Sequence, residues 1–427
     1  MPFRFVHTAD IHLDSPLRTL ALRNPELAEL IASATRQALS AIVDLCLNEA
    51  VDALFISGDL YDGDQTSMKT ARFLAGELRR LHEAGIQCFV VRGNHDALSK
   101  ITRELVLPPS VKVFGGRAET TLIQAEGGLE VAVHGVSFAS AHAPESLLPR
   151  YKAPVEGAAN LGLLHTSLSG AQGHDPYAPC SLADLAASGF DYWALGHVHK
   201  RSAPQGERTV VMPGMPQGRD INEAGAKSAT LVTVGDDRSV RVEERLTSLA
   251  QFERVAVNLE GATEWAEVAA RITSALEQAR ETTRSEHLVA RLKLEGRTPL
   301  AWRIRRDADL LRAEADERAS AVGKSWIDKL EIDGLSPPPQ AGSSKAPAEA
   351  DPLTELRRLV SDEVAASPEL ANEAQSIVEE LRGQLPAECR HILGRDEAEF
   401  QALLAELVAE GTEDVLARLD GRAPERA

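Results

Sequence analysis

The stretch Leu54-Phe-Ile-Ser-Gly-Asp-Leu-Tyr-Asp62 joins an apolar strand to a Gly-Asp turn, and a second carboxylate follows three residues later. An aspartate at the end of a buried strand must offset the cost of desolvating its charge, usually by pairing or by binding a metal. Asp59 is therefore the first candidate metal ligand, and the sequence should supply partners for it.

Three other apolar runs also stop at side chains that can bind metals. They are Asp10-Ile-His12 after residues 3–8, Gly93-Asn-His-Asp96 after residues 87–91, and Gly196-His-Val-His199 after residues 191–195. Open α/β sheets bind ligands just beyond the carboxyl ends of their strands. The sequence therefore predicts that these groups gather at one edge of a sheet.

Hydrophobic periodicity predicts alternating strands and helices in the first half of the chain. Strands are expected at residues 3–9, 54–58 and 88–91, with helical patterns at 25–48 and 67–84 between them. From Val111 to Phe138 the period changes to two, which indicates antiparallel strands. Later strands are expected at residues 161–164, 192–195, 209–212, 229–234 and 239–243. This pattern is typical of an α/β fold, a β-sandwich flanked by helices.

Composition changes divide the rest of the chain. Residues 1–248 form the predicted site-bearing domain, and residues 249–335 a small α/β domain with a strand, an amphipathic helix and a second strand. Residues 336–352 are rich in proline, serine and alanine and predict a linker. Residues 353–427 carry apolar stripes at helical spacing in an acidic background. Such tethered amphipathic helices usually dock on a partner or on their own chain.

Composition also excludes several classes of protein. The chain has 427 residues and a formal net charge of -18, so any contact with DNA must be local rather than driven by a global basic field. Cys46, Cys88, Cys180 and Cys389 stand singly, without the paired spacing of a zinc knuckle. We see no leader and no apolar run of membrane-spanning length, so a cytoplasmic location without a membrane is expected.

The candidate ligands suit a pair of divalent cations. The donors are Asp10, His12, Asp59, Asn94, His165, His197 and His199. Two cations about 3.5–4 Å apart can share one carboxylate, activate water and hold a phosphate. Asp59 is the natural bridge, and the neutral amide of Asn94 keeps the negative charge of the site low enough for an anionic phosphodiester.

Other roles are assigned by position. His95 cannot easily reach the metal bound by its neighbour Asn94, so we expect it to protonate the leaving oxygen or to stabilise the developing charge, oriented by Asp62. His165 is the ligand least fixed by spacing, and His7, His134 and His142 are the alternatives. Arg92, Lys200 and Arg219 are candidate DNA contacts, and each is equally suited to an ion pair on an acidic surface.

The ordered motifs resemble the calcineurin-like metallophosphoesterase superfamily. They are D-x-H at 10–12, G-D-x-x-D at 58–62, G-N-H-D at 93–96, the histidine of Gly162-Leu-Leu-His165, and G-H-x-H at 196–199. The opening Phe5-Val-His-Thr-Ala-Asp-Ile-His-Leu13 resembles the superfamily's DNA-repair exonuclease branch, with its SbcD- and YhaO-type bacterial nuclease subunits. At Asp62 the chain has a carboxylate, where archaeal and eukaryotic members of that branch have a histidine.

The resemblance implies several expectations. One metal would be held by Asp10, His12, Asp59 and His199. The other would be held by Asp59, Asn94, His165 and His197. Manganese would be the usual ion. The activity would be exonucleolytic, with endonuclease action on structured ends, in DNA break repair. Residues 249–335 occupy the position of a DNA-capping domain. An SMC-like coiled-coil ATPase of the SbcC type and a second copy of the chain would be partners. A phosphatase or cyclic-nucleotide phosphodiesterase, and a non-catalytic ATPase-binding subunit, are the alternatives.

Overall fold

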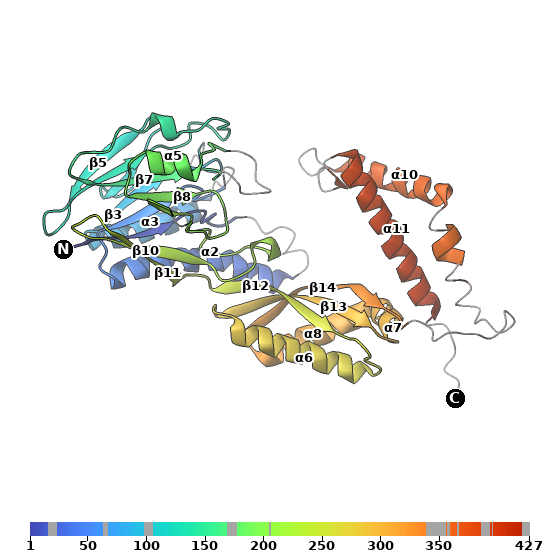
Figure 1. The fold of residues 1–427 in the computed structure, drawn as a ribbon. Coiled ribbons are helices and arrows are strands. Elements are labelled where there is room, and N and C mark those ends of the chain that lie inside the picture. Colours follow the sequence, from blue (N-terminus) through green and yellow to red (C-terminus); the bar gives the residue numbers. More distant parts are fainter. Residues whose placement is uncertain are drawn as a thin grey trace. The chain divides into compact units, whose positions relative to one another are not determined.

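The computed structural model forms three β-sheets with helices packed against them (Figure 1). It describes residues 1–15, 24–62, 67–97, 106–168, 177–204, 206–338, 356, 359–364, 367–385, 393–394 and 396–420. The predicted linker therefore lies, beyond residue 338, outside the described residues.

Contacts divide the chain into two compact units. The first consists of Met1–Arg254, Ala279–Ala290 and Lys324–Asp328, and the second of Val255–Gln278, Arg291–Gly323 and Lys329–Ala427. The units interleave along the chain, and the domain limits expected at residues 248 and 335 stay predictions.

The first sheet of the first unit has six strands in the order β11-β10-β1-β2-β3-β4. Their bounds are β1 (Phe3–Thr8), β2 (Ala53–Ser57), β3 (Gln87–Val91), β4 (Val111–Val113), β10 (Ser228–Val234) and β11 (Val240–Leu246). β1, β2, β3 and β4 are parallel to one another, whereas β10 is antiparallel to both β1 and β11. The carboxyl ends of β1, β2 and β3 consequently lie at one edge.

The second sheet has five strands in the order β5-β6-β7-β8-β9. Their bounds are β5 (Glu119–Gln124), β6 (Glu130–Gly135), β7 (Ala159–His165), β8 (Tyr192–Gly196) and β9 (Thr209–Val211). β5 and β6 form the expected antiparallel pair, and β6 to β9 are parallel. The prediction of antiparallel strands was wrong for β4, which pairs in parallel with β3. Three residues are too few for alternation to reveal the direction of a strand.

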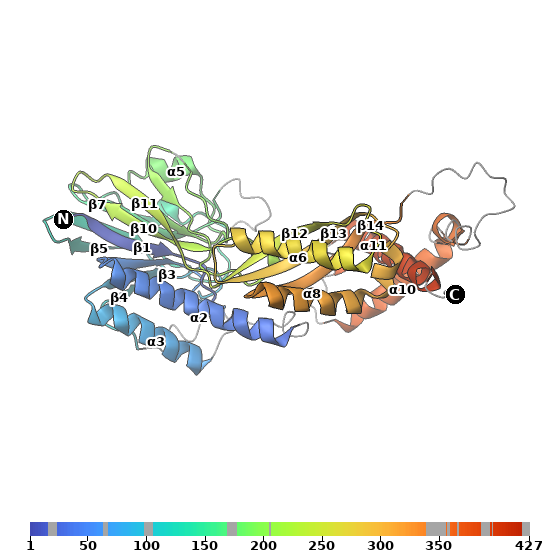
Figure 2. The same ribbon diagram turned by 90° about the horizontal axis from the view of Figure 1, so that it is seen from below.

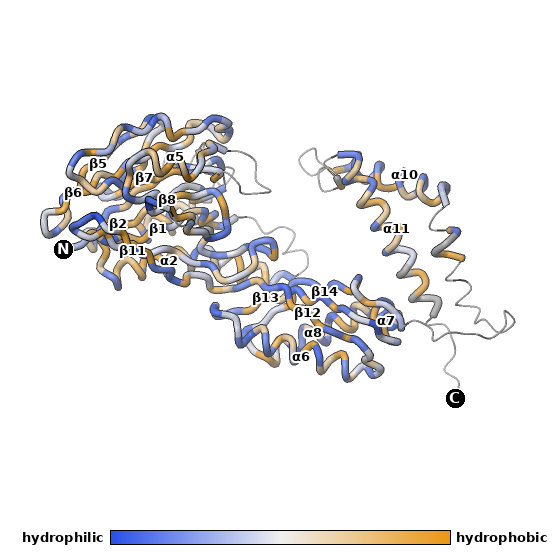
Figure 3. The backbone as a smooth tube through the Cα atoms, viewed as in Figure 1, coloured by the Kyte–Doolittle hydropathy of each residue, from blue (hydrophilic) through white to orange (hydrophobic). Residues whose placement is uncertain are grey.

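An aromatic core lies between these two sheets. Phe5 stacks on Phe55 with ring centroids 4.3 Å apart, and Phe5 meets the edge of Tyr192 of the opposite sheet at 5.3 Å. Two polar bonds also cross the core: His7 Nε2 lies 3.0 Å from the Leu195 carbonyl, and the Ser57 hydroxyl donates to the Ala194 carbonyl at 2.9 Å. Figure 3 shows the apolar residues gathered along the strands. The two sheets form the predicted sandwich.

Helices α2 (Pro25–Asn48) and α3 (Met68–Glu83) lie side by side against the six-stranded sheet (Figure 2). Asn24 caps α2 by accepting a hydrogen bond from the Leu27 amide at 3.0 Å. The expectation of no apolar run of membrane-spanning length was wrong, because α2 is long and apolar enough by length and composition alone. Its apolar face packs in the core under the sheet, as a core helix does.

Short elements complete the first unit. They are α5 (Leu182–Ala187) and the 3-10 turns η1 (Leu148–Arg150) and η2 (Ile221–Glu223). Ser181 and Asp184 form a reciprocal capping box at the start of α5, which satisfies two of its free amides. Phe190 stacks on Trp193 at 4.9 Å in the core that covers the outer face of the second sheet.

The third sheet has the strand order β12-β13-β14, with bounds β12 (Ala250–Asn258), β13 (His287–Arg297) and β14 (Ser325–Ser336). The helices that lie wholly or mainly in the second unit are α6 (Trp265–Thr282), α7 (Ala301–Arg306), α8 (Ala308–Val322), α10 (Pro368–Gln384) and α11 (Glu397–Asp420), with a π-helical turn η4 (Val360–Val364). In this unit Trp302 of α7 packs on Leu416 of α11. Val378 of α10 packs on Phe400 and Leu404 of α11. Among the described residues of 353–427, part of each apolar stripe thus packs within its own chain, while other members such as Ile377 and Leu407 stay exposed.

Candidate two-metal centre

The predicted ligands follow the carboxyl ends of five strands that belong to both sheets. Asp10 and His12 follow β1, Asp59 follows β2, Asn94 follows β3, His165 ends β7, and His197 and His199 follow β8. The parallel registers place Ser57 opposite Val91 and His165 opposite Gly196, so the loops after these strands begin at the same level. The structure brings all seven predicted ligands to one edge of the sandwich.

The backbone is held in an uncommon conformation at four of these residues. Asp10, His12, Asp59 and His197 have φ angles of 52°, 46°, 51° and 108°. Positive φ is rare outside glycine, costs energy, and concentrates at functional sites where the surroundings enforce it. The enforcing bonds run between the loops: the Asp10 amide donates to the Gly58 carbonyl, and the His12 amide to the Asp59 carbonyl, both at 3.0 Å.

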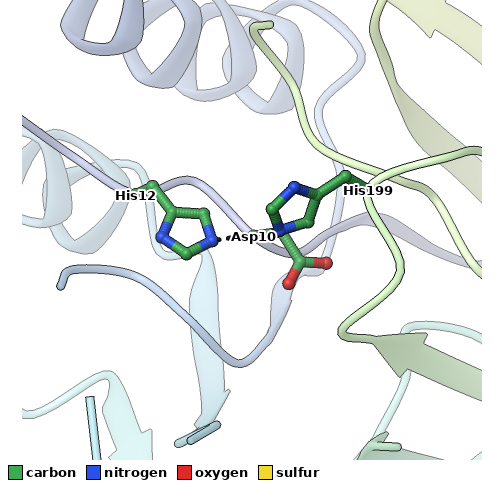
Figure 4. A group of neighbouring side chains, drawn as sticks. All are labelled: Asp10, His12 and His199. Atoms are coloured by element: carbon green, nitrogen blue, oxygen red, sulfur yellow. Dashed lines mark hydrogen bonds between the residues drawn. The ribbon is translucent and has the colours of Figure 1, made fainter. Parts of the chain in front are cut away.

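One donor group consists of Asp10, His12 and His199, whose ligand atoms all lie within 4.8 Å of one another (Figure 4). His12 Nδ1 lies 2.8 Å from Asp62 Oδ1, and His199 Nδ1 lies 2.8 Å from Glu223 Oε1. A carboxylate accepts a hydrogen bond, so each Nδ1 carries the hydrogen and Nε2 is the ring atom left to bind a metal. The two Nε2 atoms are 3.2 Å apart. A divalent cation would satisfy both lone pairs.

A second donor group consists of Asp59, His165 and His197. His165 Nδ1 donates to the Ser57 carbonyl at 2.9 Å, so its Nε2 faces oxygens: Asp59 Oδ2 at 3.3 Å and Asn94 Oδ1 at 3.1 Å. Burial lowers the pKa of His165, but the charge and hydrogen bond of Asp59, together with Asp10 and the Ser57 carbonyl, outweigh it and raise that pKa to about 9. This pocket of acceptors therefore favours a positive charge, which a metal ion would supply.

Asp59 lies between the two groups. Its Oδ2 is 3.3 Å from His165 Nε2 and 4.0 Å from His12 Nε2, while its Oδ1 accepts the His95 amide at 3.0 Å. Burial opposes its charge, but the neighbouring imidazoles hold the pKa of Asp59 below its usual range. An ionised carboxylate in this place fits the bridging role expected from the sequence.

His95 and Asp62 form a pair at the mouth of the site. His95 Nδ1 lies 3.0 Å from Asp62 Oδ1, the same oxygen that holds His12, and 47% of the His95 side chain is exposed. The hydrogen bond to Asp62 raises the pKa of His95, which favours the protonated form that a general acid needs. The sequence predicted this pair but not that Asp62 also orients His12.

Two acidic residues at the site were missed. Glu223 holds His199, and no motif marks it because it lies 24 positions away in a loop. Asp96 stands in the G-N-H-D motif without a predicted role. Its two oxygens accept the Gly93 amide at 2.7 Å and the Leu60 amide at 3.0 Å, which ties the loop after β3 to the loop after β2.

The alternative histidines lie outside both donor groups. His7 contacts the Tyr192 hydroxyl and the Leu195 carbonyl, His134 contacts Thr120 and Asn160, and His142 is exposed. Burial lowers the pKa of His7 to about 3, so it is neutral. These contacts are structural, and the geometry favours His165 as the ligand.

The candidate DNA contacts differ in their surroundings. Arg219 is paired with Glu223 at 2.7 Å, the ion-pair role that the sequence left open. Lys200 is exposed. Arg92 is partly buried, and within the part of the chain that the structure describes its Nε has no hydrogen-bond partner. Contacts of these residues with DNA stay predictions.

Comparison with known proteins gives family matches over two parts of the chain. Residues 3–201 match the calcineurin-like phosphoesterase family, and residues 252–334 match the middle domain of metallophosphoesterase YhaO. Residues 3–201 are therefore similar to calcineurin-like phosphoesterases, a class whose fold implies divalent metal ions and hydrolysis of phosphoesters. Its relatives include an uncharacterized metallophosphoesterase and several DNA double-strand break repair proteins Mre11.

Two relatives show the extent of the similarity. The chain is 36% identical over 232 residues to the uncharacterized metallophosphoesterase YhaO of Bacillus subtilis, covering 54% of this chain and 57% of that one. It is 27% identical over 248 residues to the DNA double-strand break repair protein Mre11 of Sulfurisphaera tokodaii, covering 55% and 60%. The chain thus spans less than two thirds of these relatives. A crystal structure of a dimetal phosphatase from Danio rerio matches with 12% identity and a TM-score of 0.35, covering 58% of this chain and 99% of that one.

Close packing around the donors predicts a large effect for a small substitution. A Cβ added at Gly93 would lie 2.2 Å from Asp59 Oδ1 and 2.7 Å from the His165 ring. We expect Gly93→Ala to displace these donors and abolish high-affinity metal binding, measured by calorimetric titration with Mn²⁺. Gly76→Ala in helix α3 is the control, because nothing lies within 4 Å of the Cβ that would be added there. Alanine in a helix should add about 0.5–1 kcal/mol to the free energy of unfolding. Unchanged binding in Gly93→Ala would contradict this packing.

Metal binding should also stabilise the fold, because the donors are assembled only in the folded chain. At a free Mn²⁺ concentration of about 100 times the dissociation constant, each site should add about 2.7 kcal/mol to the free energy of unfolding. Denaturant unfolding of the chelated and reloaded protein measures this gain. Absence of any gain at saturating Mn²⁺ would show that the donor groups do not bind it.

Proposed function

We propose that this protein is a metal-dependent DNA exonuclease, with endonuclease action on structured ends, that works in DNA break repair in the cytoplasm. The observation that carries the proposal is the pair of donor groups joined by Asp59, with a half-exposed histidine–carboxylate pair at their mouth. The name of the Mre11 relative supports DNA as the substrate.

The residues present divide the chemistry among them. One ion would be held by Asp10, His12, Asp59 and His199. The other would be held by Asp59, Asn94, His165 and His197. We propose Mn²⁺ for both ions. Bound ions would polarise the phosphate and activate water. His95 would deliver a proton from Nε2 to the leaving oxygen, while Asp62 keeps its Nδ1–H oriented. Asn94 and the histidines limit the negative charge that an entering phosphodiester meets.

The decisive experiment is a nuclease assay of the purified full-length chain with Mn²⁺. The substrates are end-labelled linear double-stranded and single-stranded DNA, with bis(p-nitrophenyl) phosphate as a small diester. Progressive shortening of DNA from its ends supports the proposal. Cleavage of the small diester alone, with and without an ATPase partner, would favour a phosphatase or cyclic-nucleotide phosphodiesterase. No hydrolysis of any substrate would favour a non-catalytic subunit.

We further propose that an SMC-like ATPase binds the C-terminal helices of a homodimer. An apolar groove of about 480 Å³ lies between η4, α10 and α11. Ile377 and Leu407 line it with 55% and 42% of their side-chain surface exposed. Coiled-coil helices bind such grooves through apolar side chains.

A substitution in this groove should separate partner binding from catalysis. We expect Ile377→Asp to weaken co-purification with the ATPase by at least about tenfold, equivalent to about 1.4 kcal/mol, while cleavage of the small diester is unchanged. Leu310→Asp on α8 is the matched control, because Leu310 is 57% exposed and outside the groove. Equal binding by both variants would place the ATPase elsewhere.

A further inference from the structure

Glu223 is a largely buried carboxylate that touches a candidate metal ligand. Its Oε1 accepts from His199 Nδ1 at 2.8 Å, and 9% of its side chain is exposed. This contact fixes both the tautomer and the plane of the ring, so that His199 Nε2 is directed at His12 Nε2. Partners of this kind usually affect metal affinity, because they orient a ligand and raise its basicity.

Arg219 holds Glu223 from the other side. Its Nη2 donates to Oε1 at 2.7 Å, its Nε to Oε2 at 3.3 Å, and its backbone amide to Oε2 at 2.8 Å. A fork of this kind fixes the plane of a carboxylate, which a lysine could not do. The Glu223 carboxylate therefore has little freedom to turn away from His199.

The same guanidinium reaches the second orienting carboxylate. Arg219 Nη1 donates to the Ser15 hydroxyl at 3.2 Å, and Ser15 is hydrogen-bonded to Asp62. Asp62 in turn holds His12 at 2.8 Å. The chain of contacts from His199 through Arg219 to His12 sets the two imidazoles relative to each other.

The loop that carries Glu223 is anchored in a core. Ile221 in η2 is 2% exposed and packs with Leu27, Ile31 and Phe252. Its carbonyl accepts from Arg254 Nη1 at 3.0 Å, and Asp220 caps the turn through the Asn222 amide at 2.7 Å. Glu223 is thus fixed by packing as well as by hydrogen bonds, as a residue that positions a ligand must be.

We propose that Glu223 is a positioning residue for the metal ion held by His199, and that Arg219 fixes Glu223 in this role. The inference rests on the proposed two-metal function. Glu223 is hydrogen-bonded to His199 and Arg219, so the inference predicts that the metal site of His199 depends on Glu223 and that the site of Asp59, Asn94, His165 and His197 does not.

The test is a calorimetric titration of the metal-stripped full-length chain with Mn²⁺. Glu223→Ala should weaken one of two binding events by about 10–100-fold and leave the other unchanged. Glu223→Gln should lose less, because the amide oxygen still accepts the Nδ1–H of His199. Arg219→Lys should fall between Glu223→Ala and the wild type. Asp191→Asn is the matched control, since Asp191 is 10% exposed and pairs with Arg208 at 3.1 Å without touching a histidine.

Unfolding of each metal-free variant separates positioning from loss of the fold. The inference is supported if Glu223→Ala selectively loses one Mn²⁺ and Glu223→Gln recovers part of that binding. Asp191→Asn should bind both ions as the wild type does. If Glu223→Ala bound two Mn²⁺ as tightly as the wild type does, the inference about Glu223 would be overturned, while the proposed two-metal function would stand. Equal loss of both ions in Glu223→Ala and Glu223→Gln, with lower unfolding temperatures, would assign Glu223 a purely structural role. A wild-type chain that binds no Mn²⁺ would overturn the proposed function as well.

Discussion

Asp59→Asn is expected to lower kcat/KM for phosphodiester cleavage on the order of a thousandfold. Asp59 Oδ2 lies near His165 of one donor group and His12 of the other, so the amide removes a carboxylate placed between the two groups. Metal ions contribute several kcal/mol to such reactions, and each 1.4 kcal/mol is a factor of ten in rate. Steady-state hydrolysis of bis(p-nitrophenyl) phosphate over a range of Mn²⁺ concentrations measures the loss.

Asp52→Asn is the matched control for this substitution. Asp52 precedes the same strand, β2, at its opposite end, and its Oδ2 accepts the Arg4 amide at 2.7 Å. An asparagine oxygen can accept that hydrogen bond, so we expect wild-type activity. If Asp59→Asn retained activity within tenfold of the wild type at saturating Mn²⁺, Asp59 would not bridge the two groups.

His95→Ala is expected to lower kcat on DNA by about 10²–10⁴-fold, the usual contribution of a general acid. The alkoxide that leaves from DNA needs a proton, whereas p-nitrophenolate leaves readily without one. The loss should therefore be much smaller on bis(p-nitrophenyl) phosphate, and Mn²⁺ binding should be unchanged because His95 is outside the two proposed ligand sets. Comparison of kcat for the two substrates is the measurement.

His82→Ala controls for the removal of an exposed imidazole. His82 lies on α3, where its Nδ1 contacts the Ser110 hydroxyl at 3.1 Å. It should leave both rates unchanged. Equal losses on DNA and on the small diester in His95→Ala would argue against proton donation and for a role in binding the phosphate.

Much of the site could be predicted because its ligands follow strand ends in sequence. The run 54–58 ends at Asp59 and the run 87–91 at Gly93, and parallel pairing brings such ends together without further information. The parts that could not be predicted depend on loops. Glu223 reaches His199 only because Ile221 anchors its turn in a core that includes Phe252, a contact that no local pattern encodes. The direction of β4 likewise depends on its neighbour β3 rather than on its own three residues.

The candidate metal ligands are attached to two different sheets. The thickness of the aromatic core between the sheets therefore affects the distances between these ligands. Asp10, Asp59 and Asn94 are attached to the six-stranded sheet, and His165 and His197 to the five-stranded one. The rings of Phe5 and Tyr192 are in contact between the two sheets and help to set the distance from one sheet to the other. Substitutions at such positions would alter the separation of the two ions without touching a ligand. Selection for a different metal or substrate can therefore act on the interior of the sandwich.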